Sequence, residues 1–190
     1  MNTSIDIQRD HVAMSIVLDA MEKRAYEIHN NGNVDFFRIG QILDFLHNYT
    51  DHLHYAKEER ILFPFVLDEN KPWIAKTIDK LIHEHALARD YIIEIDKNLR
   101  ACLAGDADAL MDLASFMLKY VKLETDHIKV EDEIVMPLFK KHMNNNKLTD
   151  FNFEFKQIPA GRIDPLKYLE YSRLINILSA ENFYSGKMGI

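Results

Sequence analysis

The chain has 190 residues, of which 47% are apolar and 28% are charged, a composition typical of a globular protein with a sizeable buried core. A net charge of −7 argues against a nucleic-acid partner, and the single cysteine excludes an intramolecular disulfide and favours a reducing compartment. The N-terminal sequence does not resemble a signal peptide and no apolar run approaches the ~20 residues that cross a membrane, so we expect a cytoplasmic protein with no membrane partner.

The first half of the chain shows two helical stripes. Apolar residues recur at alternating spacings of three and four from His11 to Ile28, which predicts a first helix. The segment NNGNVD (30–35) has the composition of a turn. A second stripe from Phe36 to Leu62 predicts a second helix, which ends at DENKP (68–72).

The second half repeats this pattern. Pro72 suits the first turn of a helix, and a third stripe follows from Ile78 to Leu99. The segment AGDAD (104–108) separates it from a fourth stripe, which extends from Leu110 to Ile134. The asparagine-rich segment NNNK (144–147) then ends the fourth helix.

Short turns between long helices make neighbouring helices antiparallel. The sequence therefore predicts an all-α fold, an antiparallel up-down-up-down four-helix bundle over residues 1–146. Residues 147–190 form a C-terminal extension that starts irregularly and continues with a short amphipathic helix near 166–178. Three arrangements of this extension fit the sequence: packing on the bundle, covering one of its ends, or contact with another subunit.

Each of the four stripes contains one histidine, and counting along the helices places all four at one level. His11 and His54 each lie 21 residues from the centre of the first turn. His85 and His127 each lie 20 residues from the third turn. Because all helices rise equally per residue, the four imidazoles are predicted to face one another inside the bundle.

Two glutamates join them, because HYAKEERILFP (54–64) and HIKVEDEIVMP (127–137) both carry Glu four residues after His. Glu58 and Glu131 therefore lie one turn beyond His54 and His127 on the same helix faces. Two buried carboxylates are costly without positive charge. Protonation or pairing with the histidines would reduce this cost, and bridging two metal ions would remove it directly.

The predicted metal ligands are thus nitrogen and oxygen atoms without sulfur, which fits iron or manganese, with zinc as a further alternative. The candidate ligands are His11, His54, Glu58, His85, His127 and Glu131. His11 precedes His54 by 43 residues, and His85 precedes His127 by 42. Two hairpins of one plan would therefore each supply half of a pseudo-symmetric site for two ions.

Other polar residues on or beside the stripes receive weaker predictions. We expect Arg89 to pair with Glu124 on the side of the histidines away from the two glutamates, or else Glu124 to bind metal itself. Glu59 and Asp132 are candidate hydrogen-bond acceptors for the ligands. The remaining histidines are predicted to be surface or structural residues: His29, His47, His52, His83 and His142.

The segments RDHVAMSIVLDAME, HLHYAKEERILFP, LIHEHALARD and DHIKVEDEIVMPLF resemble the hemerythrin family in its bacterial HHE cation-binding branch, over about residues 5–142. The resemblance implies a non-haem di-iron centre with two iron ions and an open position for O2. It implies that Glu58 and Glu131 bridge the irons and that the four histidines are terminal ligands.

The chain departs from the classical O2 carrier at two positions. Arg89 stands four residues after His85, where the carrier has a second histidine, so one iron would be open or hold water. The second carboxylate is Glu131, at four residues after His127, rather than an aspartate at five.

We therefore expect a dimetal protein that binds O2 or a related small ligand, NO or peroxide, for sensing, storage or detoxification, and favour a binding protein over an enzyme. One alternative is a ferritin-like di-iron oxidase or peroxidase. That class uses Glu-x-x-His on two helices, whereas only ETDH (124–127) fits here. Another alternative is a metal-free bundle whose function lies in residues 147–190.

Overall fold

The computed structural model describes residues 3–68, 71–142, 153 and 164–187. Across these residues the regular structure is helical and contains no strand, which confirms the all-α class. The elements are α1 (Thr3–Asn31), α2 (Phe36–Phe45), η1 (Leu46–Tyr55), η2 (Glu58–Leu62), α3 (Phe63–Leu67), α4 (Pro72–Leu103), α5 (Ala109–Val130), η3 (Glu131–Val135), α6 (Met136–His142) and α8 (Pro165–Lys187).

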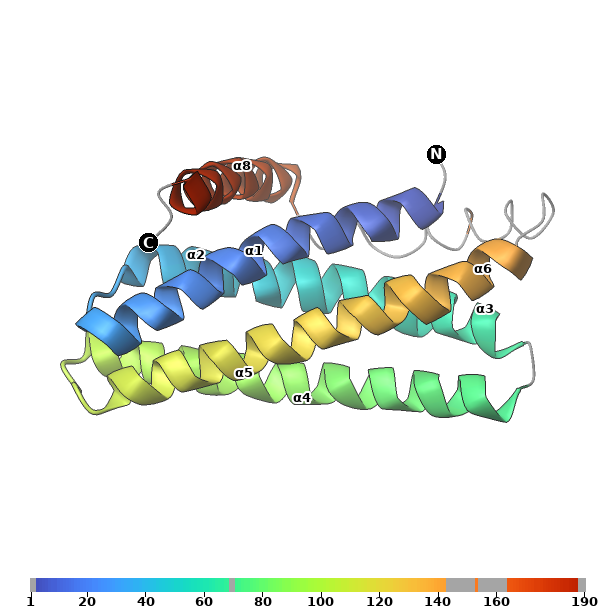
Figure 1. The fold of residues 1–190 in the computed structure, drawn as a ribbon, viewed down its shortest axis with the longest axis horizontal. Coiled ribbons are helices and arrows are strands. Elements are labelled where there is room, and N and C mark those ends of the chain that lie inside the picture. The colour runs from blue at the N-terminus through green and yellow to red at the C-terminus, as the bar shows by residue number, and fades with distance from the viewer. Residues whose placement is uncertain (1–2, 69–70, 143–152, 154–163, 188–190) are drawn as a thin grey trace.

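Long helical segments lie side by side along the longest axis of the molecule (Figure 1). The α2 segment continues through η1 and η2 into α3, and α5 continues through η3 into α6. The most extensive contacts join α4 to α5 and α1 to α5. This arrangement places the inward faces of α1, η1, α4 and α5 around a common interior.

The turns follow from local chemistry. Gly32 has φ of +64° and donates its backbone N–H to the carbonyl of Ile28, which ends α1. The Asp35 side chain accepts the N–H of Arg38 at 2.9 Å and so caps α2. Pro72 occupies the first position of α4, where its missing N–H costs nothing.

Both His-x-x-x-Glu motifs coincide with widened, π-helical turns. The turn η1 contains His54, while Glu58 begins η2 and Glu131 begins η3. Such turns are rare in proteins and are frequent at functional sites, because they redirect a side chain without ending the helix. The same distortion at corresponding points of both hairpins suggests that it serves the residues around it.

The interior contains an apolar core with polar groups within it. The largest fully buried side chains include Phe45, Phe63, Phe139, Tyr55 and Tyr120. Burying this apolar area supplies the main stabilisation of the fold, at roughly 25 cal/mol per Å². In the part of the chain that the structure describes, no helix is long and apolar enough to cross a lipid bilayer.

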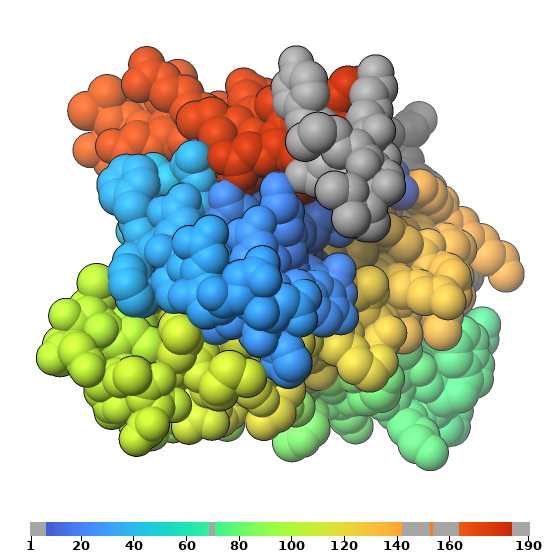
Figure 2. All heavy atoms as spheres, turned by 60° about the vertical axis from the view of Figure 1, so that its left-hand side comes forward, coloured from blue at the N-terminus to red at the C-terminus, as the bar shows by residue number. Residues whose placement is uncertain are grey.

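The helix predicted near 166–178 is longer than expected, since α8 spans 23 residues from Pro165 to Lys187. It packs against α1 (Figures 1 and 2), the first of the three arrangements considered. Glu181, beyond the predicted end, forms ion pairs with Arg24 at 2.6 Å and Arg38 at 3.2 Å. These ion pairs stabilise α8 beyond residue 178, where its predicted apolar stripe ends.

Replacement by alanine should change the free energy of unfolding in opposite directions at two glycines. Gly105 has φ of +95°, so Gly105→Ala should lower the free energy of unfolding by about 1–2 kcal/mol. Gly40 lies within α2 with free space around an added Cβ, so Gly40→Ala should raise it by roughly 0.5–1 kcal/mol. Urea denaturation of both variants measures the two changes, and equal effects in the same direction would contradict this account of the turn.

Candidate metal centre

The structure brings together all six residues predicted as metal ligands. Five have no exposed surface and His11 is 3% exposed. His11 comes from α1, His54 from η1, His85 from α4 and His127 from α5, while the glutamates Glu58 and Glu131 begin η2 and η3. Their role as ligands stays a prediction, and their geometry bears on it directly.

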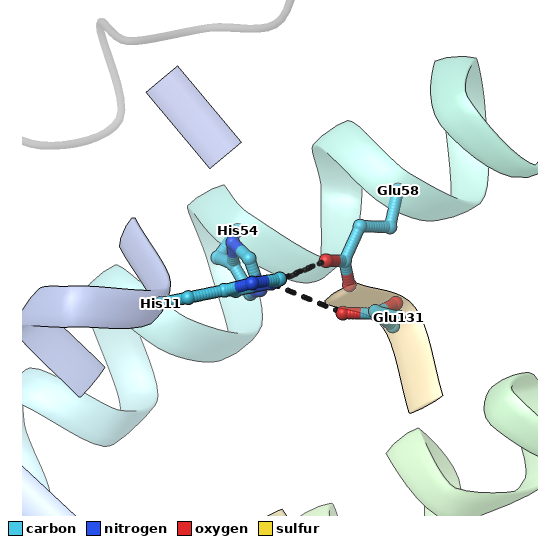
Figure 3. A group of neighbouring side chains, drawn as sticks. All are labelled: His11, His54, Glu58 and Glu131. Carbon is cyan, nitrogen blue, oxygen red and sulfur yellow. Dashed lines mark ion pairs between the residues drawn. The ribbon is translucent and has the colours of Figure 1, made fainter. Parts of the chain in front are cut away.

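One group of four combines His11 and His54 with both glutamates, and Figure 3 shows these side chains converging. The Nε2 atom of His11 lies 3.7 Å from Oε1 of Glu58 and 3.1 Å from Oε2 of Glu131. The Nε2 atom of His54 lies 2.9 Å from Oε1 of Glu58. All four ligand atoms lie within 4.8 Å of one another.

The second group combines His85 and His127 with the same two glutamates. The Nε2 atom of His85 lies 3.3 Å from Oε2 of Glu58, and that of His127 lies 3.4 Å from Oε1 of Glu131. Each glutamate thus turns one oxygen toward each pair of histidines. This is the geometry of a carboxylate that bridges two ions.

The Nδ1 atom of each imidazole, on the side away from the two glutamates, forms a hydrogen bond with a further carboxylate. Asp132 lies 3.0 Å from Nδ1 of His11 and Glu59 lies 2.8 Å from that of His85, as predicted for both acids. A donating Nδ1–H leaves the Nε2 lone pair facing the interior, which is the tautomer a metal ion needs.

Asp10 and Glu84 do the same for the other two imidazoles, and sequence reasoning missed them. Asp10 lies 3.3 Å from Nδ1 of His54, and Glu84 lies 3.1 Å from that of His127. Each of these acids directly precedes the first histidine of its hairpin, His11 or His85. The repeated acid-His dipeptide was the available signal.

The outer carboxylates have cationic partners. Lys57 Nζ lies 2.5 Å from Asp10, Lys80 Nζ lies 3.1 Å from Glu84, and the Arg89 guanidinium lies 3.1 Å from Glu59. Burial alone would raise the pKa of Asp10, but the hydrogen bond from His54 and the positive charges of Lys57 and His54 outweigh it and lower this pKa. The acids therefore remain ionised acceptors.

The surrounding carboxylates also raise the pKa values of the imidazoles. Burial alone would lower the pKa of His54, but Glu58 and Asp10 outweigh it and raise the pKa to about 9. Burial is likewise outweighed at His11, where Asp132 and Glu131 raise the pKa to about 12. Without metal the site attracts protons, and a metal ion must displace them.

A test of fit for metal comes from the polar atoms themselves. Several fully enclosed atoms lack a hydrogen-bond partner: Nε2 of His11, Nε2 of His54, and both side-chain oxygens of Glu58 and of Glu131. The Nε2 atoms of His85 and His127 face each other at 3.1 Å. Buried polar atoms normally have partners. Two cations placed about 2.1 Å from these donors would provide them.

The predicted pair of Arg89 and Glu124 is wrong. Arg89 instead binds Asp51 at 2.7 Å and Glu59 at 3.1 Å, and its side chain is 38% exposed. Glu124 is fully buried and accepts the hydroxyl of Tyr55 at 2.5 Å. Glu124 belongs to neither candidate metal group among the described residues. Counting along helices gives the level of a residue, but not the point that a long side chain such as that of Arg89 reaches.

Tyr55 links Glu124 to His85 of the candidate metal centre. Its ring stacks on His85 with centroids 3.8 Å apart and planes inclined by 13°. Burial raises the pKa of Glu124, only partly offset by His127 and the Tyr55 hydrogen bond. The second carboxylate oxygen of Glu124 and the hydroxyl of Tyr120 are also buried without a hydrogen-bond partner. A polar layer therefore borders the histidines on the side away from Glu58.

The remaining histidines do not approach the centre. His29, His52 and His83 are exposed and His47 is half-buried, and none belongs to a candidate metal group within the described chain. The side chain of His142 lies outside the described residues. This agrees with a surface or structural role for the four that can be judged.

A model of the hemerythrin HHE cation-binding domain matches residues 5–140. The match covers well over half of the chain, so the chain belongs to the hemerythrin family of HHE cation-binding domains. Neither curated proteins nor solved structures gave a significant match. The family domain contains both candidate metal groups and ends before α8.

The raised pKa of His54 predicts how pH affects metal-free protein. Protonated His54 binds Glu58 and Asp10, so its stabilisation is complete below its ordinary pKa of 6.5 and disappears as the pH rises through about 9. The free energy of unfolding of metal-stripped protein should therefore fall between pH 6.5 and 9. His54 accounts for on the order of 3 kcal/mol of this fall, and His11, whose pKa is also raised, acts in the same direction.

Urea denaturation at several pH values measures this dependence. Metal-loaded protein should not show this loss of stability. Metal ions bind the neutral imidazole and release its proton, so metal binding becomes more favourable as the pH rises. A metal-free protein that becomes more stable over this interval would contradict the assigned pairing of His54.

The buried pair of Tyr55 and Glu124 gives a separate prediction. Tyr55→Phe leaves the carboxyl group without its donor and should lower the free energy of unfolding by about 1–3 kcal/mol. Adding Glu124→Leu should recover most of this loss, because both polar partners are then removed. Tyr91→Phe, at a half-buried tyrosine, is the control and should change stability by less than about 0.5 kcal/mol. Additive losses in the double variant would refute the pairing.

Proposed function

We propose that the chain is a non-haem dimetal protein, with two iron ions as the favoured pair, that binds O2 or a related small ligand such as NO or peroxide. The observation that carries the proposal is the sharing of Glu58 and Glu131 between two otherwise separate histidine pairs. Membership of the HHE cation-binding family supports it. Imidazole and carboxylate donors without thiolate favour iron or manganese, with zinc as the alternative.

The proposal includes the scaffold. Residues 1–146 would form an antiparallel up-down-up-down four-helix bundle, with residues 147–190 as an extension. Contacts between α1 and α5 and between α4 and α5 support this arrangement. In it each hairpin delivers one histidine from its first helix and a His-x-x-x-Glu motif from its second.

In this proposal His11 and His54 would hold one ion and His85 and His127 the other, with Glu58 and Glu131 shared between the two. A di-iron pair supplies reversible electron donation to a small ligand. The chain orients the imidazoles, with Nε2 toward the interior, through Asp10, Glu59, Glu84 and Asp132, and it excludes bulk water by near-complete burial. Two histidines and two shared carboxylates leave each ion further coordination positions for a small ligand.

A binding role is favoured over ferritin-like oxidase chemistry. The second role would use Glu-x-x-His as a ligand pair, and Glu124 would have to bind metal with His127. Glu124 is instead bound to Tyr55. The proposed location is the cytoplasm, in keeping with the single cysteine.

Metal analysis of purified protein tests the proposal. Wild-type protein reconstituted with Fe²⁺ under argon should hold two irons per chain. His11→Ala or His85→Ala should each remove about one iron, while Glu58→Gln should weaken the binding of both irons, because Glu58, like Glu131, belongs to both candidate metal groups. The matched control is His83→Ala, two residues from His85 and exposed, which should keep both irons.

Ligand binding is tested on the same samples by absorption spectroscopy. Admission of O2 should produce a charge-transfer band that the Glu58→Gln variant lacks. Wild-type protein that holds no transition metal after aerobic and anaerobic preparation would overturn the metal assignment. Loaded protein whose spectrum does not respond to O2, NO or peroxide would overturn the ligand assignment.

A further inference from the structure

The two halves of the candidate metal centre differ in what surrounds one outer carboxylate. Asp10, behind His54, also accepts the Lys57 ammonium group at 2.5 Å and the Tyr49 hydroxyl at 2.6 Å. Its counterpart Glu84, behind His127, meets the exposed side chain of Lys80. The tyrosine contact is therefore an addition to the symmetric plan.

The sequence confirms that this addition belongs to one hairpin. Tyr49 stands five residues before His54. The residue five before His127 is Lys122, which is exposed and pairs with Asp126 at 2.9 Å. Asp10 thus accepts a buried tyrosine hydroxyl, whereas the contacts described for Glu84 are with His127 and Lys80.

Tyr49 is held in a cluster of rings that includes α8. Its ring stacks on Phe45, with centroids 4.7 Å apart. The rings of Tyr168 and Tyr171 from α8 meet it edge-on, each with a centroid distance of 6.2 Å. Tyr49 is only 8% exposed, so these contacts leave its ring little freedom to move.

The docked helix is fastened near both ends. Tyr171 donates its hydroxyl to Asp44 Oδ2 at 3.0 Å, and Lys167 pairs with the same oxygen at 3.1 Å. Glu181 pairs with Arg24 and Arg38 farther along α8. Figure 2 shows α8 lying directly on α1 and α2. The region therefore has a fixed position although it lies outside the matched family domain.

We infer that α8 helps to orient one histidine of the metal centre. It holds the ring of Tyr49 in place, and the Tyr49 hydroxyl holds Asp10, which in turn orients His54. Tyr49, Tyr168 and Tyr171 are positioning residues in this chain of contacts. The inference rests on the proposed function. Its consequence is an asymmetric site, in which the ion at His11 and His54 depends on α8 and the ion at His85 and His127 does not.

Release of Fe²⁺ to an excess of a coloured ferrous chelator, from full-length protein under argon, tests the inference. In Tyr49→Phe and in Tyr171→Ala, one of the two irons should leave roughly 10-fold or more faster than from wild type, by analogy with the loss of other outer contacts. The other iron should leave at the wild-type rate. This remaining iron is an internal control for folding.

Three further variants separate positioning from general loosening. Leu169→Ala, on the exposed side of α8, should release iron as wild type does. Asp10→Asn should accelerate the same single iron. Tyr49→Phe combined with Asp10→Asn should be no faster than Asp10→Asn alone, because both changes act on one contact chain.

The outcomes distinguish this inference from the function on which it rests. Equal acceleration of both irons, no acceleration of either, or additive effects in the double variant would overturn the role of α8 while leaving the dimetal site intact. Wild-type protein that takes up no iron would overturn the proposed function and this inference with it. Tyr49→Phe removes one oxygen only, so it remains informative if Tyr171→Ala fails to fold.

Discussion

The complete burial of Glu58 and Glu131 is the constraint on which the rest of the structure depends. Each of their four oxygens is enclosed without a hydrogen-bond donor. Burial of two carboxylates in an apolar interior costs several kcal/mol each unless positive charge compensates them. Four imidazoles surround the pair, and burial is outweighed at Glu58 by His54 and the other histidines, which lower its pKa. Protons on the Nε2 atoms or metal ions bound to these atoms can supply the charge, and the two compete for the same lone pairs.

This constraint accounts for the polar residues farther out. An imidazole presents Nε2 to a cation only if Nδ1 carries the hydrogen, and four carboxylates ensure this. Within each hairpin the acid before the first histidine serves the second histidine. The acid after Glu58 or Glu131 serves the first histidine of the other half of the chain. Each half thereby orients a histidine of the other, and π-helical turns begin at both of these glutamates.

Sequence reasoning predicted the helices and the six inward residues well, because helical period and residue counts determine face and height. Residue counts do not determine where the end of a long side chain lies, so Arg89 was assigned to Glu124 although its guanidinium reaches Asp51 and Glu59 at the edge of the interior. Asp10 was missed because an acid beside a histidine resembles any surface charge until a partner helix is placed against it. The contact of α8 with Tyr49 depends on docking of a distant segment, which leaves no periodic signal in either stretch.

X-ray diffraction from crystals loaded with iron, recorded at the iron absorption edge, tests the central claim most directly. The account predicts two anomalous peaks separated by about 3.5–4 Å, the spacing usual for paired metal sites. One peak should lie against His11 and His54, the other against His85 and His127, with both touching Glu58 and Glu131. A single peak, or peaks bound by residues outside these six, would contradict it.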